Sequence, residues 1–228
     1  MKRVIDGVFR GTLKTLGPKA SPTGIFKEPV KGPVAVGSEG LSGDHQGDRR
    51  VHGGPEKAIH LYPSVHYASW VTEYPHLESQ MQPGSFGENI SVGCMDEGDV
   101  CLGDRFRLGT AVVEFSQGRQ PCWKLNARFL EPRLAKAVQD TGRTGWYFRV
   151  IEPGTVSAGD ALELVERPHG SWSLARVTRL FYVDQLNYDA LEELAAIASL
   201  AESWRKLACR RLERREVEDW NRRLNGEA

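Results

Sequence analysis

The chain has 228 residues, of which 40% are hydrophobic and 26% are charged, and its 30 basic residues balance its 30 acidic residues. This length is enough to bury a core without disulfides or structural metals, and it indicates one or two domains. The neutral balance excludes a strongly basic nucleic-acid-binding chain and does not favour an anionic membrane as the main partner.

The first residues, MKRVIDGVFRG, carry charges without the apolar run of a signal peptide, and no segment approaches the roughly 18 apolar residues that a membrane helix needs. We therefore expect a cytoplasmic protein. It has four cysteines and no C-x-x-C pair, so neither disulfides nor a zinc ribbon is expected.

From residue 1 to 167, short runs with alternating apolar residues recur between turns rich in Gly and Pro. These expected strands are 4–13, 32–37, 58–62, 89–93, 104–117, 145–151 and 160–166. Many short strands with tight turns predict a mainly β fold, a barrel or a sandwich. Two helices are expected within it, over 63–74 with Ser64 as N-cap and over 131–142 with Gly142 after its end, both covering barrel openings.

Residues 168–228 have a different character, because glycine is absent between Ser171 and Arg223 and apolar residues follow helical spacing. Three short helices are predicted, forming a small module that docks on the barrel, where it either shields the barrel or binds a partner. The charged tail over 210–228 is interpreted as a solvated helix face. The predicted domains are therefore a barrel-like domain, 1–167, and a helical module with its tail, 168–228.

Cys122 stands out because it follows Pro121 and has Arg119 and Lys124 close by in the sequence. Cations lower the pKa of a thiol, and a thiolate binds soft metals or attacks electrophiles. Simple packing is the alternative role for this cysteine.

A second polar segment, 40–63, interrupts its regular structure with glycines and holds several titratable residues: Asp44, His45, Asp48, Arg49, Arg50, His52, Glu56, Lys57 and His60. Its Asp and His residues raise a divalent-metal hydrolase as one possibility, but no H-E-x-x-H is present, and the two arginines favour an anion over a metal. Together with Cys122 the segment suggests an anionic cofactor that carries a soft metal. His60 is expected to face solvent from its strand, and His66 and His76 are interpreted as surface residues.

Four sequence motifs carry a family resemblance: TGIFK at 23–27, GDHQGDRRVHGGPEKAIHLYP at 43–63, FGEN at 86–89 and RQPCWKL at 119–125. With these the chain resembles the MOSC domain, in the YiiM-like branch, and the C-terminal helices resemble the 3-alpha domain of that branch. The family pattern commonly has proline where this chain has Gly118, which we expect to add flexibility before the cysteine.

The resemblance implies a barrel-like fold that binds the molybdenum cofactor (molybdopterin), with Cys122 as the molybdenum ligand. It also assigns roles to other residues at the site. Lys27, Arg49, Lys57 and Arg119 would bind the polar end of the cofactor, Thr23 and Asn89 would hydrogen bond to the pterin, and His52 and Asp48 would shape the site or manage protons.

The implied activity is reductive cleavage of the N–O bond of N-hydroxylated compounds such as 6-N-hydroxylaminopurine, giving amine and water and detoxifying mutagenic bases. No flavin or iron–sulfur motif is evident, so a separate flavoprotein or other reductase is expected to supply electrons. The expected partners are thus this reductase and a small-molecule substrate, with no nucleic acid or membrane. A non-catalytic carrier of the cofactor or of activated sulfur is the alternative, and the divalent-metal hydrolase is a third possibility.

Overall fold

The computed structural model describes residues 1–17, 20–47 and 53–226, and within them eight strands form one large sheet. Its order is β13-β9-β10-β11-β7-β8-β1-β4, and pairing of β1 with β13 closes seven of the described strands into a barrel. All neighbouring pairs are antiparallel except β7 and β8. The barrel strands are β1 (Lys2–Arg10), β7 (Ile59–Pro63), β8 (Ile90–Val92), β9 (Arg105–Leu108), β10 (Ala111–Gly118), β11 (Trp146–Glu152) and β13 (Ala161–Glu166). The predicted mainly β, barrel-like class is confirmed.

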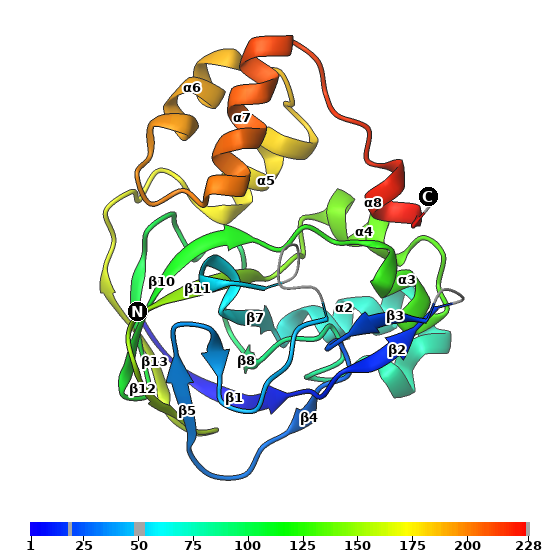
Figure 1. Ribbon diagram of the computed structural model, residues 1–228, viewed down its shortest axis with the longest axis vertical. Helices are drawn as coiled ribbons and strands as arrows, with labels where there is room; N and C mark the ends of the chain where they lie inside the picture. The colour runs from blue at the N-terminus through cyan, green and yellow to red at the C-terminus, as the bar shows by residue number, and fades with distance from the viewer. Residues whose placement is uncertain (18–19, 48–52, 227–228) are drawn as a thin grey trace.

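Short strands lie around the barrel, with β2 and β3 at the right of the view and β5 at the lower left (Figure 1). The strand β4 (Glu28–Pro29) pairs with β1, while β2 (Lys14–Leu16) and β3 (Ser21–Thr23) form a hairpin. A three-stranded sheet combines β5 (Val34–Gly37), β6 (Gly40–Leu41) and β12 (Gly154–Val156). The 3₁₀ helix η1 (Pro55–Lys57) leads directly into β7.

Both helices expected in the barrel domain are present, and the structure adds another beside the predicted cysteine site. The helix α2 (Val65–Glu73) is followed by the 3₁₀ helix η2 (Pro75–Gln80), and α4 (Leu134–Thr141) ends at Gly142 in the left-handed conformation. The added helix, α3 (Trp123–Phe129), begins immediately after Cys122. Ser64 precedes α2 without a side-chain cap, because its hydroxyl donates to Asp6 at 2.8 Å instead.

The expected three-helix module is also present, as α5 (Leu174–Tyr182), α6 (Tyr188–Ala196) and α7 (Glu202–Arg214). Ser173 and Asn187 cap α5 and α6 by accepting backbone N–H groups. The three helices stand on one end of the barrel beside β10 and β11 (Figure 1). Buried side chains of the module and of the barrel form one continuous hydrophobic cluster, so the module docks on the barrel as expected.

Two sequence-based interpretations of residues as solvent-exposed are wrong, one for the charged tail and one for His66. The tail is not merely a solvated face, because the fully buried Arg211 guanidinium donates to Glu218 at 2.8 and 3.0 Å and to the carbonyl of Phe181 at 3.0 Å. The tail then forms a further helix, α8 (Asn221–Asn225). His66 is not a surface residue either, since it is buried and lies 2.8 Å from Glu97.

Candidate active site

Cys122 lies between a barrel strand and a helix. The strand β10 ends at Gly118, residues 119–121 cross the gap, and Cys122 occupies the N-cap position of α3 with extended backbone. Its carbonyl accepts the Leu125 N–H at 2.9 Å, which fixes the start of the helix. The side chain is half-buried and lines a pocket. It is therefore not sealed in the core as a packing residue would be.

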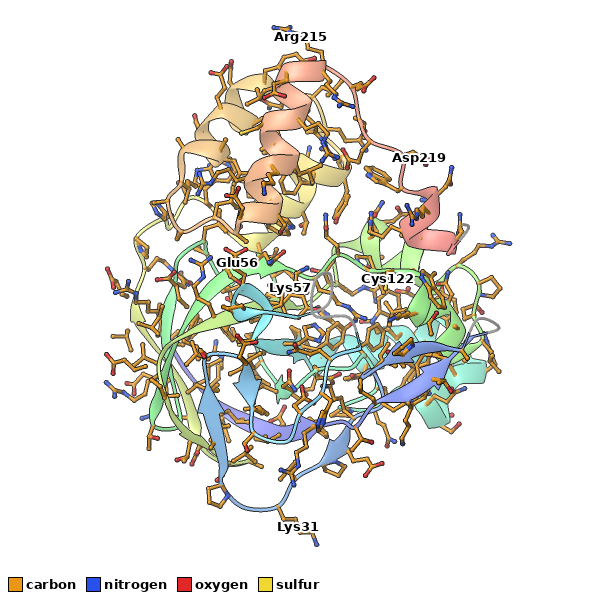
Figure 2. The ribbon with its side chains drawn as sticks, viewed as in Figure 1. Lys31, Glu56, Lys57, Cys122, Arg215 and Asp219 are labelled. Carbon is orange, nitrogen blue, oxygen red and sulfur yellow. The ribbon has the colours of Figure 1, made fainter. Side chains whose placement is uncertain are left out.

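The wall of the pocket comes from segments far apart in the chain. Six predicted site residues line it together: Thr23, Lys27, Lys57, Asn89, Arg119 and Cys122. Lys57 and Cys122 are labelled in Figure 2, below the three-helix module. The other three, Asp48, Arg49 and His52, lie outside the described residues.

Arg119 lies three residues before Cys122 in the sequence. Its side chain lines the pocket, the residue is only 8% exposed, and its backbone N–H donates to the carbonyl of Gly145 at 3.0 Å. The guanidinium Nη1 is buried without a hydrogen-bond partner in the described parts of the chain. Leaving a buried donor unsatisfied costs about 1–3 kcal/mol, more when the group is charged. An acceptor on a ligand would satisfy this atom.

Lys27 and Asp44 form a buried ion pair in the pocket wall, with side chains 5% and 3% exposed. Asp44 also accepts the Gly11 N–H at 2.8 Å and the Asn89 side-chain amide at 2.9 Å. Burial lowers the pKa of Lys27, and the charge of Asp44 partly opposes this. Both oxygens of the Asp44 carboxylate thus already accept hydrogen bonds from the protein.

Asn89, the last residue of the FGEN motif, braces the wall. Its side-chain oxygen accepts the His60 N–H at 3.0 Å, and its amide nitrogen serves Asp44 and the carbonyl of Phe9. The preceding Glu88 is fully buried, with its carboxylate accepting the Tyr67 hydroxyl and the Gly84 N–H, each at 2.6 Å. Both side chains hold the loop that brings Gly87 to the pocket.

Lys57 places a second charge near the thiol. Burial lowers the pKa of Lys57, while the charges of Glu56 and Cys122 act in the opposite direction. Lys57 is the last residue of η1, whose backbone turns on a hydrogen bond from the Lys57 N–H to the carbonyl of Gly54 at 2.9 Å. Of the described side chains that line the pocket, Lys27, Lys57, Arg119 and Lys124 are basic and only Asp44 is acidic. This excess of positive charge suits an anionic ligand.

The pocket lining includes His60 and Tyr147, which the sequence analysis did not assign to the site. His60 was expected to face solvent, which is wrong: it is buried, and its ring lies 4.9 Å from that of Tyr147, its register partner on β11. Burial, reinforced by the charge of Arg119, lowers the pKa of His60 well below its ordinary value. Every residue of β7 is buried. The alternation of apolar and polar residues in this strand therefore could not show whether His60 faces solvent or a pocket.

No group of three or more His, Cys, Asp or Glu side chains able to hold a metal ion occurs among residues 1–17, 20–47 and 53–226. Nor is any helix in these ranges long and apolar enough to cross a membrane. The four cysteines are all free thiols.

The fold and the site define a protein of the MOSC class, and the chain belongs to that family. The MOSC domain matches residues 48–163. Within the family the chain falls in the YiiM-like branch, because the YiiM-like 3-alpha helix domain matches residues 172–215. The predicted boundary after residue 167 falls between these two ranges and stays a prediction.

Similar proteins support this assignment over the whole chain. Protein YiiM of Escherichia coli K12 is 36% identical over 226 residues, which cover 99% of this chain and 100% of that protein. The crystal structure of YiiM from E. coli matches with a TM-score of 0.80 at 32% identity, covering 94% of this chain and 98% of that one. YiiM from Geobacillus stearothermophilus matches with a TM-score of 0.79 at 37% identity, covering 93% and 100%.

A longer relative has an activity in its name. A protein of Gibberella moniliformis called "Reductase" is 38% identical over 170 residues, which are 74% of this chain but only 30% of that protein.

Proposed function

We propose that this protein is a molybdenum-cofactor-dependent reductase of N-hydroxylated compounds such as 6-N-hydroxylaminopurine. Membership of the MOSC family and similarity to a protein named as a reductase support an oxidoreductase role. The observation that carries the proposal is the pairing of a half-buried thiol, Cys122, with a buried and unsatisfied guanidinium, Arg119, in one basic pocket.

The described residues fit the molybdenum cofactor. A thiolate is a suitable ligand for a soft metal, and Cys122 offers the sulfur. Arg119 and Lys57 lie in the same pocket, and such cations bind phosphate. Arg49 and Lys27 are proposed for the same polar end, with Lys27 already paired to Asp44. Thr23 is proposed to hydrogen bond to the pterin, and its buried hydroxyl also accepts the Ile25 N–H at 3.3 Å.

When bound, the cofactor supplies the two-electron redox chemistry at the N–O bond. The balanced reaction takes a hydroxylamine, two electrons and two protons to an amine and water. The protein then has to orient the substrate, place charge and deliver protons, for which Asp48 and His52 remain the proposed residues. A separate flavoprotein or other reductase is proposed as the electron donor.

The test compares the wild type with Cys122→Ser, both purified from cells that make the cofactor. Cys209→Ser is the matched control, because Cys209 is also half-buried but lies on α7 outside the pocket. Molybdenum content is measured by mass spectrometry, and reduction of 6-N-hydroxylaminopurine is followed with a chemical reductant in place of the partner.

We expect equimolar molybdenum and turnover in the wild type and in Cys209→Ser. Cys122→Ser should lose both while its unfolding free energy changes by less than about 1 kcal/mol, because a half-buried thiol contributes little to stability. Wild type that holds molybdenum but reduces no N-hydroxylated substrate would favour the carrier function. Normal turnover by Cys122→Ser would rule out ligation by this residue.

A further inference from the structure

The C-terminal helices contact β10 over the residues that lead to Cys122. The Ala201 N–H, at the start of α7, donates to the carbonyl of Ser116 at 3.3 Å. The hydroxyl of Ser203 donates to the side-chain oxygen of Gln117 at 3.0 Å. The end of β10 is therefore held from the module side as well as by its neighbouring strands.

Gly118 shows how closely the module approaches. A Cβ atom at this position would lie 2.6 Å from Cδ1 of Leu174 and 3.0 Å from the ring of Trp204. Real Cβ atoms do not make such contacts, so glycine allows α5 and α7 to pack directly on the strand backbone. Gly118 thus provides close packing here, and the expected flexibility stays a prediction.

Arg223, on α8, reaches the residue immediately before the cysteine. Its Nη1 donates to the carbonyl of Pro121, 102 positions earlier in the chain, and its Nη2 donates to Oε1 of Gln139 at 2.5 Å. Gln139 is itself on α4 and only 2% exposed. The guanidinium therefore joins α8, α4 and the cysteine loop at a single point.

The helix α8 is short, but it is anchored on both sides. The carbonyl of Leu224 accepts the Asn126 side-chain amide of α3 at 2.9 Å, and the Leu224 side chain is buried. At the other end, the ring of Trp220 meets the ring of Tyr182 of α5 edge to face at 5.7 Å. Figure 1 shows α8 beside α3 and α4, with the tail crossing from α7 to reach them. Arg223 thus has a fixed support.

We propose that Arg223 is a positioning residue for Cys122, acting through the carbonyl of Pro121. Proline fixes its own φ and has no N–H, so the carbonyl is the only hydrogen-bonding backbone group of Pro121. Fixing that carbonyl sets the orientation of the peptide that leads into Cys122, and with it the direction of the sulfur. The expected effect on turnover rests on the proposed function, whereas the effect on the thiol itself does not.

The test uses the full chain with Cys94→Ser and Cys209→Ser. Two cysteines then remain, and because Cys101 is buried, Cys122 is the thiol that reacts. Into this background go Arg223→Ala, Arg223→Lys and the control Arg222→Ala, which removes an exposed charge from the same helix. Alkylation of Cys122 by iodoacetamide at fixed pH, and hydrogen exchange of peptides covering 119–125, are measured by mass spectrometry without cofactor or substrate. Peptides covering 188–196 report on the module.

We expect Arg223→Ala to speed hydrogen exchange over 119–125 by about ten-fold, through loss of a charge-assisted hydrogen bond, and to speed Cys122 alkylation by at least about three-fold. Exchange over 188–196 should not change. Arg223→Lys should be intermediate, because one nitrogen replaces a two-pronged donor. The control Arg222→Ala should match the background.

Unchanged exchange over 119–125 in folded Arg223→Ala would overturn the proposal. The proposal would also be overturned if Arg223→Lys showed background exchange over 119–125 while Arg222→Ala sped that exchange as much as Arg223→Ala. Those two results together would assign the effect to charge alone. If Arg223→Ala does not fold, Arg223→Lys against Arg222→Ala decides by the same criteria. Turnover by cofactor-loaded Arg223→Ala should fall about ten-fold. Wild type without turnover would count against the proposed function, while the alkylation and exchange results would still decide the role of Arg223.

Discussion

The buried ion pair of Lys27 and Asp44 gives a prediction whose size follows from the structure. Asp44→Asn keeps the shape of the side chain but removes the charge that compensates Lys27. It also places an amide group where the carboxylate accepted hydrogen bonds from Gly11 and Asn89. Breaking a buried pair on one side costs about 3–5 kcal/mol. We expect Asp44→Asn to lose that much unfolding free energy at neutral pH.

The double variant Lys27→Met, Asp44→Asn separates pairing from shape. Methionine removes the stranded charge, so the double variant should be more stable than Asp44→Asn alone. Burial lowers the pKa of Lys27 in the folded state. Between that lowered pKa and pH 10.5, the unfolded chain therefore binds a proton that the folded state has lost. The stability of Asp44→Asn should therefore recover as the pH rises toward that value, and the double variant should lack this recovery.

Urea unfolding of the wild type, Asp44→Asn, Lys27→Met and the double variant provides the assay, with Glu28→Gln as the matched control. Glu28 pairs with Lys14 at 3.5 Å, but these side chains are 78% and 47% exposed, so this pair should contribute less than about 1 kcal/mol. If Asp44→Asn cost no more than Glu28→Gln at an unchanged urea dependence, the buried pair would not be a major stabilising contact. Strict additivity in the double variant would contradict the pairing itself.

Two further predictions concern the pocket and the module. The pKa of His60 is well below its ordinary value in the folded state, so below pH 6.5 the unfolded chain gains this proton before the folded state does. The unfolding free energy should therefore fall, by up to about 1.4 kcal/mol per pH unit, as the pH drops below 6.5, and His60→Gln should flatten this fall; an equal slope in both proteins would contradict it. Gly118→Ala should cost about 1–3 kcal/mol in urea unfolding because the new Cβ meets Leu174 and Trp204, whereas Gly37→Ala, whose nearest atom lies at 4.0 Å, should cost less; equal costs would refute the close packing.

The sequence predicted the architecture because local patterns determine most of it. Alternating strands between Gly and Pro turns led to the barrel, and helical spacing of apolar residues in a segment without glycine led to the module. Six of the nine predicted site residues line one pocket, because the motifs that contain them are brought together by strand pairing. Composition and spacing alone singled out Cys122, but the expected roles of its neighbours depended on the family resemblance.

What the sequence could not show depends on long-range contacts. His60 and Tyr147 face the pocket because β7 pairs with β11, and neither strand pattern contains that register. The tail looks solvated because its charges alternate. Yet the buried Arg211 donates to Glu218, seven positions later, and Arg223 donates to the carbonyl of Pro121, 102 positions earlier. A charged residue whose partners are distant in the sequence cannot be distinguished from a surface residue by spacing.

The pocket contains more positive charge than its own wall neutralises, and this limits what can bind there. The one acidic side chain among the described lining residues, Asp44, is already bonded to Lys27, and Lys124 donates to a neutral carbonyl, that of Pro22, at 2.8 Å. The buried Nη1 of Arg119 has no hydrogen-bond partner among the described residues, so it requires either water or an anion. Cys122 is three residues from Arg119 on the same restrained loop. A ligand that carries both an anionic group and a soft metal, as in the proposed function, would therefore contact both side chains.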